Sequence, residues 1–157
     1  LLLLDEPFSN LDYSRKMELR ERLFSYAKEH QLSVMISTHE IQEILPWTDQ
    51  IVVLQEGRMI QNDNAEETFN NPYNSYVAKL LGEVNTVTEE EKSLLNISKN
   101  YFFPHKIHLK ENGLEAEVLE SRFAGNHYWN KIVINNIPLI MYSERKIEGK
   151  INVEIES

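Results

Sequence analysis

The first part of the chain alternates apolar runs with an amphipathic stretch, in the order expected of a strand–helix–strand unit. Leu1–Leu4 is fully apolar and ends at Asp5-Glu6-Pro7, which is typical of a buried parallel strand entering a loop. Asp12 is a good N-cap for a helix over residues 13–30, with an apolar stripe at Leu19, Leu23 and Ala27. A second buried strand is expected over residues 33–37. It should run parallel to the first, because such crossovers are right-handed.

Short elements are expected between residues 40 and 82. A helix over about 40–46 should stop at Pro46, and strands over 50–54 and 58–61 should form a hairpin around Glu56-Gly57. Asn64 and Asn74 are placed to cap helices over about 65–70 and 75–81, and Gly82 ends the second. We therefore expect residues 1–82 to form one α/β part.

The pattern changes after Gly82. Residues 86–92 are polar and acidic, which predicts a linker over residues 83–100 or the start of an exposed helix. Short β-rich runs separated by turn residues follow, at 106–109, 115–121, 128–134, 138–142 and 150–156. Five short strands at this spacing predict a small all-β barrel or sandwich over residues 101–157.

Composition and charge exclude several classes of function. The 157 residues carry a formal net charge of −9, which argues against a general nucleic-acid or anionic-membrane surface. The absence of cysteine excludes disulfides and thiol nucleophiles. No apolar run approaches the roughly 20 residues needed to span a bilayer. Because the chain begins without Met in an expected buried strand, we expect it to be the C-terminal part of a longer protein.

Candidate chemistry gathers where the first two strands end. Open α/β folds bind ligands at the carboxyl ends of their strands, where Asp5 can hold Mg²⁺ on nucleotide phosphates. The neighbouring Glu6 can orient or deprotonate a water molecule, and His39 at the next strand end can reach a terminal phosphate. The structural alternative is two solvated acids and an exposed histidine. The ordered occurrence of all these segments favours a functional site.

Three segments resemble motifs of the ATP-binding subunits of ABC transporters. Leu1–Pro7 resembles the Walker B motif, Ser9–Asp12 the D-loop, and Ser37–Glu40 the H-loop. The resemblance implies part of a P-loop NTPase fold that binds ATP and Mg²⁺. It further implies that Asp5 coordinates Mg²⁺ through water, Glu6 is the general base and His39 contacts the γ-phosphate. Ser9 and Asp12 would then lie in the loop that communicates across a nucleotide-sandwich dimer.

Residues 66–157 resemble one group within this family, the ATP-binding subunits of maltose, spermidine, sulfate and iron(III) importers. Residues 66–85 resemble the end of their ATPase domain, and residues 101–157 resemble their C-terminal regulatory domain, an OB-like barrel called TOBE. Phe103-Pro104 stands where that domain usually has Arg-Pro. The resemblance implies a second ATPase subunit in a homodimer, permease subunits and a solute-binding protein as partners. It also implies a peripheral position on the cytoplasmic face of the inner or plasma membrane.

The sequence departs from the family in one important way. It contains no GxxxxGKS/T phosphate loop, no Q-loop and no LSGGQ-type signature, so the chain alone is expected neither to bind nor to hydrolyse ATP. An alternative from another class is a non-enzymatic regulatory or oxyanion-binding module that uses the C-terminal barrel. A related ATPase of DNA repair or translation is a weaker alternative, disfavoured by the acidic charge and the β-rich tail.

Overall fold

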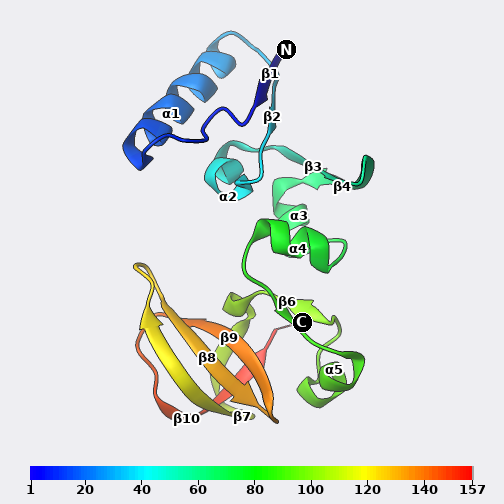
Figure 1. The fold of residues 1–157 in the computed structure, drawn as a ribbon, viewed down its shortest axis with the longest axis vertical. Helices are drawn as coiled ribbons and strands as arrows, with labels where there is room; N and C mark the ends of the chain where they lie inside the picture. Colours follow the sequence, from blue (N-terminus) through cyan, green and yellow to red (C-terminus); the bar gives the residue numbers. More distant parts are fainter. Residues whose placement is uncertain (157) are drawn as a thin grey trace. The chain divides into compact units, whose positions relative to one another are not determined.

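The computed structural model describes residues 1–156, which divide into two compact units. The first unit is Leu1–Asn71 and the second begins at Pro72 (Figure 1). This division precedes helix α4 (Ser75–Leu81), which the sequence pattern grouped with the first part. None of the described helices is long and apolar enough to cross a membrane.

The first unit opens with the expected strand–helix–strand motif. Strands β1 (Leu2–Asp5) and β2 (Val34–Ser37) pair in parallel, and helix α1 (Tyr13–Glu29) connects them. The Asp12 carboxylate accepts a hydrogen bond from the Arg15 backbone N–H at 3.0 Å, which confirms the predicted N-cap. The α/β character of this part is therefore as predicted.

The buried face of α1 differs from the predicted stripe. Ala27 is buried as expected, but Leu19 is 41% exposed and Arg20 is only 4% exposed. The guanidinium of Arg20 lies over the rings of Phe8 and Trp47, at 5.9 and 5.5 Å from their centroids. These rings give the charged group an aromatic environment, so Arg20 occupies the inward face of the helix and Leu19 does not.

Short elements complete the first unit. Helix α2 (Ile41–Ile44) is shorter than predicted, because the chain continues through Pro46 as a 3-10 helix over Leu45–Trp47. Strands β3 (Gln50–Gln55) and β4 (Arg58–Asn64) form the expected hairpin, with β4 longer than predicted. Helix α3 (Ala65–Asn70) follows, and the Asn64 side chain caps it.

The second unit begins with α4 and a pair of short strands around a helix. Strand β5 (Asn85–Thr86) pairs antiparallel with β6 (Tyr101–Phe102), and α5 (Glu89–Leu95) lies between them in sequence. Thr88 and Glu91 form a reciprocal capping box at the start of α5. Leu95 is 2% exposed and belongs to the core of this unit, so residues 83–100 pack against the β-rich part.

Four long strands form an antiparallel sheet in the order β10-β7-β8-β9. They are β7 (Ile107–Phe123), β8 (Tyr128–Ile134), β9 (Ile137–Ser143) and β10 (Gly149–Ile155). The five expected runs form four strands of this sheet, because the first two runs are one continuous strand, β7. The Asn112-Gly113 turn signal marks an irregularity inside β7, where the partners of Asn152 and Val153 jump from Glu115 to Leu109.

Gly113 explains how β7 passes so close to β10. A Cβ atom at this position would lie 2.2 Å from the Val153 carbonyl oxygen, so only glycine fits without moving the backbone. The sheet curves strongly in Figure 1. Over residues 1–156, however, β9 and β10 remain its two edges, so a closed barrel is not observed. Its core contains Ile107, Ile132, Ile134, Leu139 and Val153.

Candidate functional site

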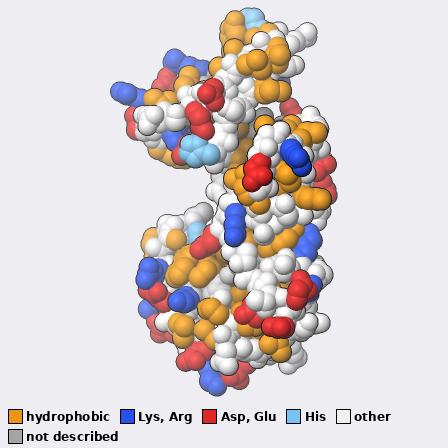
Figure 2. All heavy atoms as spheres, turned by 45° about the vertical axis from the view of Figure 1, so that its right-hand side comes forward, with side chains coloured by type: hydrophobic (Ala, Val, Ile, Leu, Met, Phe, Trp, Pro, Cys, Tyr) orange, Lys and Arg blue, Asp and Glu red, His pale blue; other side chains and the backbone are white. Residues whose placement is uncertain are grey.

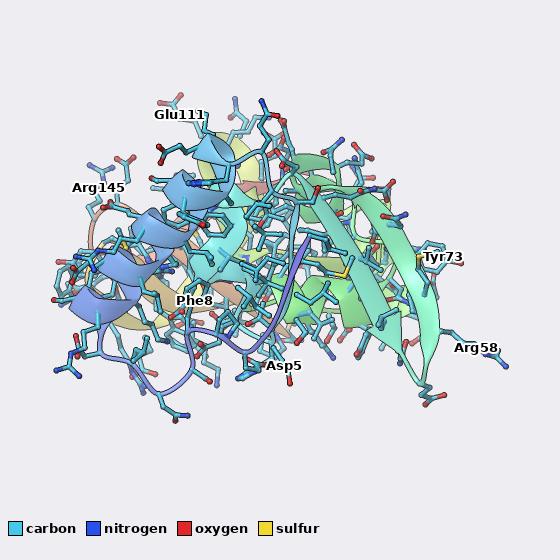
Figure 3. All side chains as sticks on the ribbon, turned by 90° about the horizontal axis from the view of Figure 1, so that it is seen from above. Asp5, Phe8, Arg58, Tyr73, Glu111 and Arg145 are labelled. Atoms are coloured by element: carbon cyan, nitrogen blue, oxygen red, sulfur yellow. The ribbon has the colours of Figure 1, made fainter. Side chains whose placement is uncertain are left out.

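The carboxyl ends of β1 and β2 meet, as the sequence predicted. Asp5 lies opposite Ser37 in the parallel register, and the Ser37 hydroxyl donates a hydrogen bond to the Asp5 carboxylate. Figure 3 shows Asp5 where β1 ends and the loop toward α1 begins. Both strand ends therefore present polar side chains to the same place.

Glu6 is the residue on which the two loops converge. Its backbone N–H donates to the Ser37 carbonyl at 2.9 Å, and its φ of 45° places it in the left-handed region. Carboxylate oxygen Oε1 accepts from the His39 backbone N–H at 3.2 Å and lies 2.6 Å from His39 Nδ1. The Thr38 hydroxyl donates to Oε2 at 3.4 Å. The loop after β2 thus holds the Glu6 side chain from three directions.

The pair with Glu6 changes the protonation of His39. The hydrogen bond to Glu6, with the attraction of the same carboxylate, raises the pKa of His39 above its ordinary value of 6.5. The nearby charges act in opposite directions, because Glu40 raises the pKa and Lys16 lowers it. The imidazole remains largely exposed, with 73% of the side-chain surface accessible, so it can reach a ligand in solvent.

The loop between β1 and α1 places the remaining predicted residues. Ser9 is tied to Glu6, since its N–H and its hydroxyl both donate to the Glu6 carbonyl, at 3.2 and 2.8 Å. Phe8 is buried and anchors the loop beside α1 (Figure 3). Asp12 is separate: it faces solvent and contacts Arg15 through the cap and a 3.3 Å ion pair. The structure therefore unites Asp5, Glu6, Ser9 and His39, and leaves Asp12 at the helix start.

Asp5 is the side chain of this site best suited to bind a magnesium ion. Among residues 1–156, no group of three or more His, Asp or Glu side chains is arranged to hold a metal. Mg²⁺ in nucleotide sites commonly uses one or two carboxylates, with water and phosphate oxygens for the remainder. The exposed Asp5 carboxylate, steadied by Ser37, fits that single-carboxylate role.

Some residues of the site were not identified from the sequence. Lys16 reaches from α1 to the acids that follow His39, donating to Glu40 at 3.1 Å and to Glu43 at 2.9 Å. The one feature of the sequence that could have pointed to Lys16 is its spacing of four residues from Arg20 on the same predicted helix. That spacing alone indicates a solvated face, so only the fold reveals the contact.

Comparison with curated proteins finds extensive similarity. A spermidine/putrescine import ATP-binding protein of Borreliella afzelii is 34% identical over 117 residues, which is 74% of this chain and 33% of the relative. A sulfate/thiosulfate import ATP-binding protein of Bacillus cereus is 42% identical over 85 residues, 54% of this chain and 24% of the relative. The spermidine/putrescine protein of Acetivibrio thermocellus is 25% identical over 177 residues, covering 99% of this chain and 50% of the relative.

The chain is homologous to ATP-binding subunits of ABC importers. This finding confirms the resemblance to that family. The chain spans a quarter to half of the length of these importer subunits. No family model matches it.

Proposed function

We propose that the complete protein is the ATP-hydrolysing subunit of an ABC importer, and that this chain contributes one edge of its nucleotide site. The observation that carries the proposal is the Glu6 carboxylate at the end of β1, facing the His39 imidazole at 2.6 Å. Homology to ABC importer ATP-binding subunits supports the same conclusion.

Each residue of this edge has a role that its chemistry suits. Asp5 would hold Mg²⁺ through water, and the ion, when bound, would supply positive charge to the phosphate groups. Glu6 orients the attacking water and accepts its proton. The water oxygen bonds to the γ-phosphorus as the bond to the β,γ-bridging oxygen breaks, giving ADP and phosphate. His39 contacts the γ-phosphate, and its raised pKa favours the charged form that would stabilise this group.

The remaining parts of the proposal concern the assembly. Ser9 and Asp12 belong to the loop that communicates with a second ATPase subunit in a homodimer. Transmembrane permease subunits and a solute-binding protein are the further partners, and the protein works at the cytoplasmic face of the membrane. The residues present contain no phosphate loop, so we propose that this chain alone does not hydrolyse ATP.

We also propose that residues 1–82 correspond to the C-terminal half of the nucleotide-binding domain and residues 101–157 to a TOBE-like regulatory domain, with 83–100 between them. Support comes from the antiparallel sheet and its long bent strand β7. The alternative of an oxyanion-binding module has less support, because many basic side chains of this unit are paired with acids. These are Lys92, Lys106, Lys110, Arg122, Lys146 and Lys150.

The test uses the complete open reading frame that contains this chain. Glu6→Gln should retain ATP binding while turnover falls by about a hundredfold or more, because the base is lost and the shape is kept. Glu18→Gln is the matched control, since Glu18 is an exposed acid paired with Arg22 on α1. Steady-state phosphate release and nucleotide binding are measured. Turnover of Glu6→Gln within about twofold of wild type would show that Glu6 is not the base.

A further inference from the structure

A cluster of charged side chains joins the two helices that follow the candidate catalytic segments. Helix α1 begins directly after Asp12, and α2 begins two residues after His39. Lys16 on α1 donates to Glu40 and Glu43, and its side chain is only 12% exposed. The side chains of Glu40 and Glu43 are 40% and 31% exposed, so this bridge is partly open to water, and its importance is that it ties α1 to the segment that follows His39.

Arg20 extends the same connection by one helical turn. Its Nε donates to the Lys16 carbonyl at 3.2 Å, and Nη1 donates to the Glu43 carbonyl. The guanidinium also lies over Phe8, which sits in the loop directly after Glu6 and Pro7. Through the Phe8 ring the cluster contacts the loop that contains Glu6, and through Glu43 it contacts the helix that follows His39.

We propose that Lys16 is a positioning residue that holds the His39 loop in place opposite Glu6. This inference rests on the proposed function of Glu6 and His39. Glu40 directly follows His39, and its N–H is bound by the Thr38 hydroxyl at 3.0 Å, so anchoring Glu40 restrains the residue before it. Without Lys16, Glu40 and Glu43 lose the cation between them and repel each other. The loop would then move away from Glu6.

The experiment compares substitutions in the complete open reading frame. Lys16→Met keeps the length of the side chain and removes its charge, whereas Lys16→Arg keeps the charge. Glu40→Gln removes the partner instead, as a second route if Lys16→Met fails to fold. Arg22→Met is the control, because Arg22 pairs with Glu18 at 2.7 Å within α1 and joins no second element.

We expect Lys16→Met and Glu40→Gln to lower kcat between about tenfold and a hundredfold, with KM for ATP changed less than about twofold. Lys16→Arg should recover kcat to within about threefold of wild type, and Arg22→Met should match wild type. A kcat of Lys16→Met within about twofold of wild type would overturn the inference. If Lys16→Met does not fold, the same result for Glu40→Gln would overturn it. Failure of Lys16→Arg to recover kcat would also overturn it.

A second readout does not depend on ATP hydrolysis. If Lys16 acts only through its charge, its removal raises the pKa of His39, because Lys16 lowers that pKa in the folded protein. If Lys16 positions the loop, Lys16→Met lowers the pKa of His39 toward its ordinary value, since the contact with Glu6 is lost. An NMR titration of the His39 ring separates these outcomes. Should the wild-type protein not hydrolyse ATP, the proposed function fails, and this titration decides the positioning role alone.

Discussion

At the scale of single residues, Glu6 combines an unusual backbone with a heavily bonded side chain. A φ of 45° is uncommon for a non-glycine residue and persists only where the surroundings hold it. Here the Glu6 N–H binds the Ser37 carbonyl, and the Glu6 carbonyl accepts two hydrogen bonds from Ser9. This backbone directs the carboxylate toward the His39 loop, which explains why adjacent acids, Asp5 and Glu6, have different partners.

The pairing of Glu6 with His39 predicts a pH effect. We expect Glu6→Gln to lower the pKa of His39 toward 6.5, because the hydrogen bond to the carboxylate is the largest cause of its upward shift. In the wild type, the raised pKa means that the stability from this pair is present below the unfolded-state value and lost as pH rises through the folded-state value. NMR titration of the His39 ring measures the shift.

Glu29→Gln, at the far end of α1, is the control for that titration. An unchanged His39 pKa in Glu6→Gln would contradict the pairing.

At the scale of elements, one side chain makes hydrogen bonds to the edge strand β9 of the kind that a neighbouring strand would make. Asn85 is 6% exposed, and its carboxamide both donates to and accepts from the backbone of Ile140, each at 2.7 Å. An unpaired edge would expose these groups to another chain. The Asn85 side chain therefore ties β5 to the sheet and closes part of its edge.

Asn85→Ala should destabilise the second unit by about 1–3 kcal/mol, because the Ile140 N–H and carbonyl lose their partner. Urea unfolding in a Trp47→Phe background measures the change, since Trp129 then reports on the second unit alone. Asn152→Ala removes an exposed hydrogen bond to the Glu111 carbonyl and should cost less than about 0.5 kcal/mol. Equal effects of the two substitutions would show that Asn85 has no special role.

At the scale of the whole molecule, the two units bury apolar side chains to different extents. The main core cluster lies entirely in the second unit, from Val87 to Ile155. In the first unit, strands β1 and β2 form a two-stranded sheet on which Leu3 and Met35 are 65% and 62% exposed. Figure 2 shows hydrophobic side chains at the surface among scattered acidic and basic ones. Two strands alone make a marginal sheet.

This difference predicts unequal protection from hydrogen exchange in the 157-residue chain. Backbone amides of β8 and β9, such as those of Ile132 and Leu139, should exchange slowest, because opening them requires unfolding of the core. Amides of β1 and β2 should exchange much faster. Exchange measured by NMR or mass spectrometry tests this, and equal protection of β2 and β8 would contradict it.

Local signals were sufficient for much of the fold and part of the site. Asp12, Asn64 and Asn74 are cap residues whose side chains bond the helix they begin, and each acts over three residues. The meeting of Asp5 with the second strand end was also predictable, because parallel strands bring their carboxyl ends to one edge. Interactions between residues close in sequence, and contacts imposed by the order of the strands, could therefore be predicted from the sequence.

The amino-acid pattern alone was therefore enough to predict the strand–helix–strand order, the helix starts and a candidate site at Asp5, Glu6 and His39. Three features became evident only in the folded chain: Arg20 faces inward, β7 continues through Gly113, and Lys16 joins α1 to α2. Each of these depends on a partner far along the chain, such as Trp47, Val153 or Glu40. Their pairing energies are set by packing in three dimensions, which local periodicity does not contain.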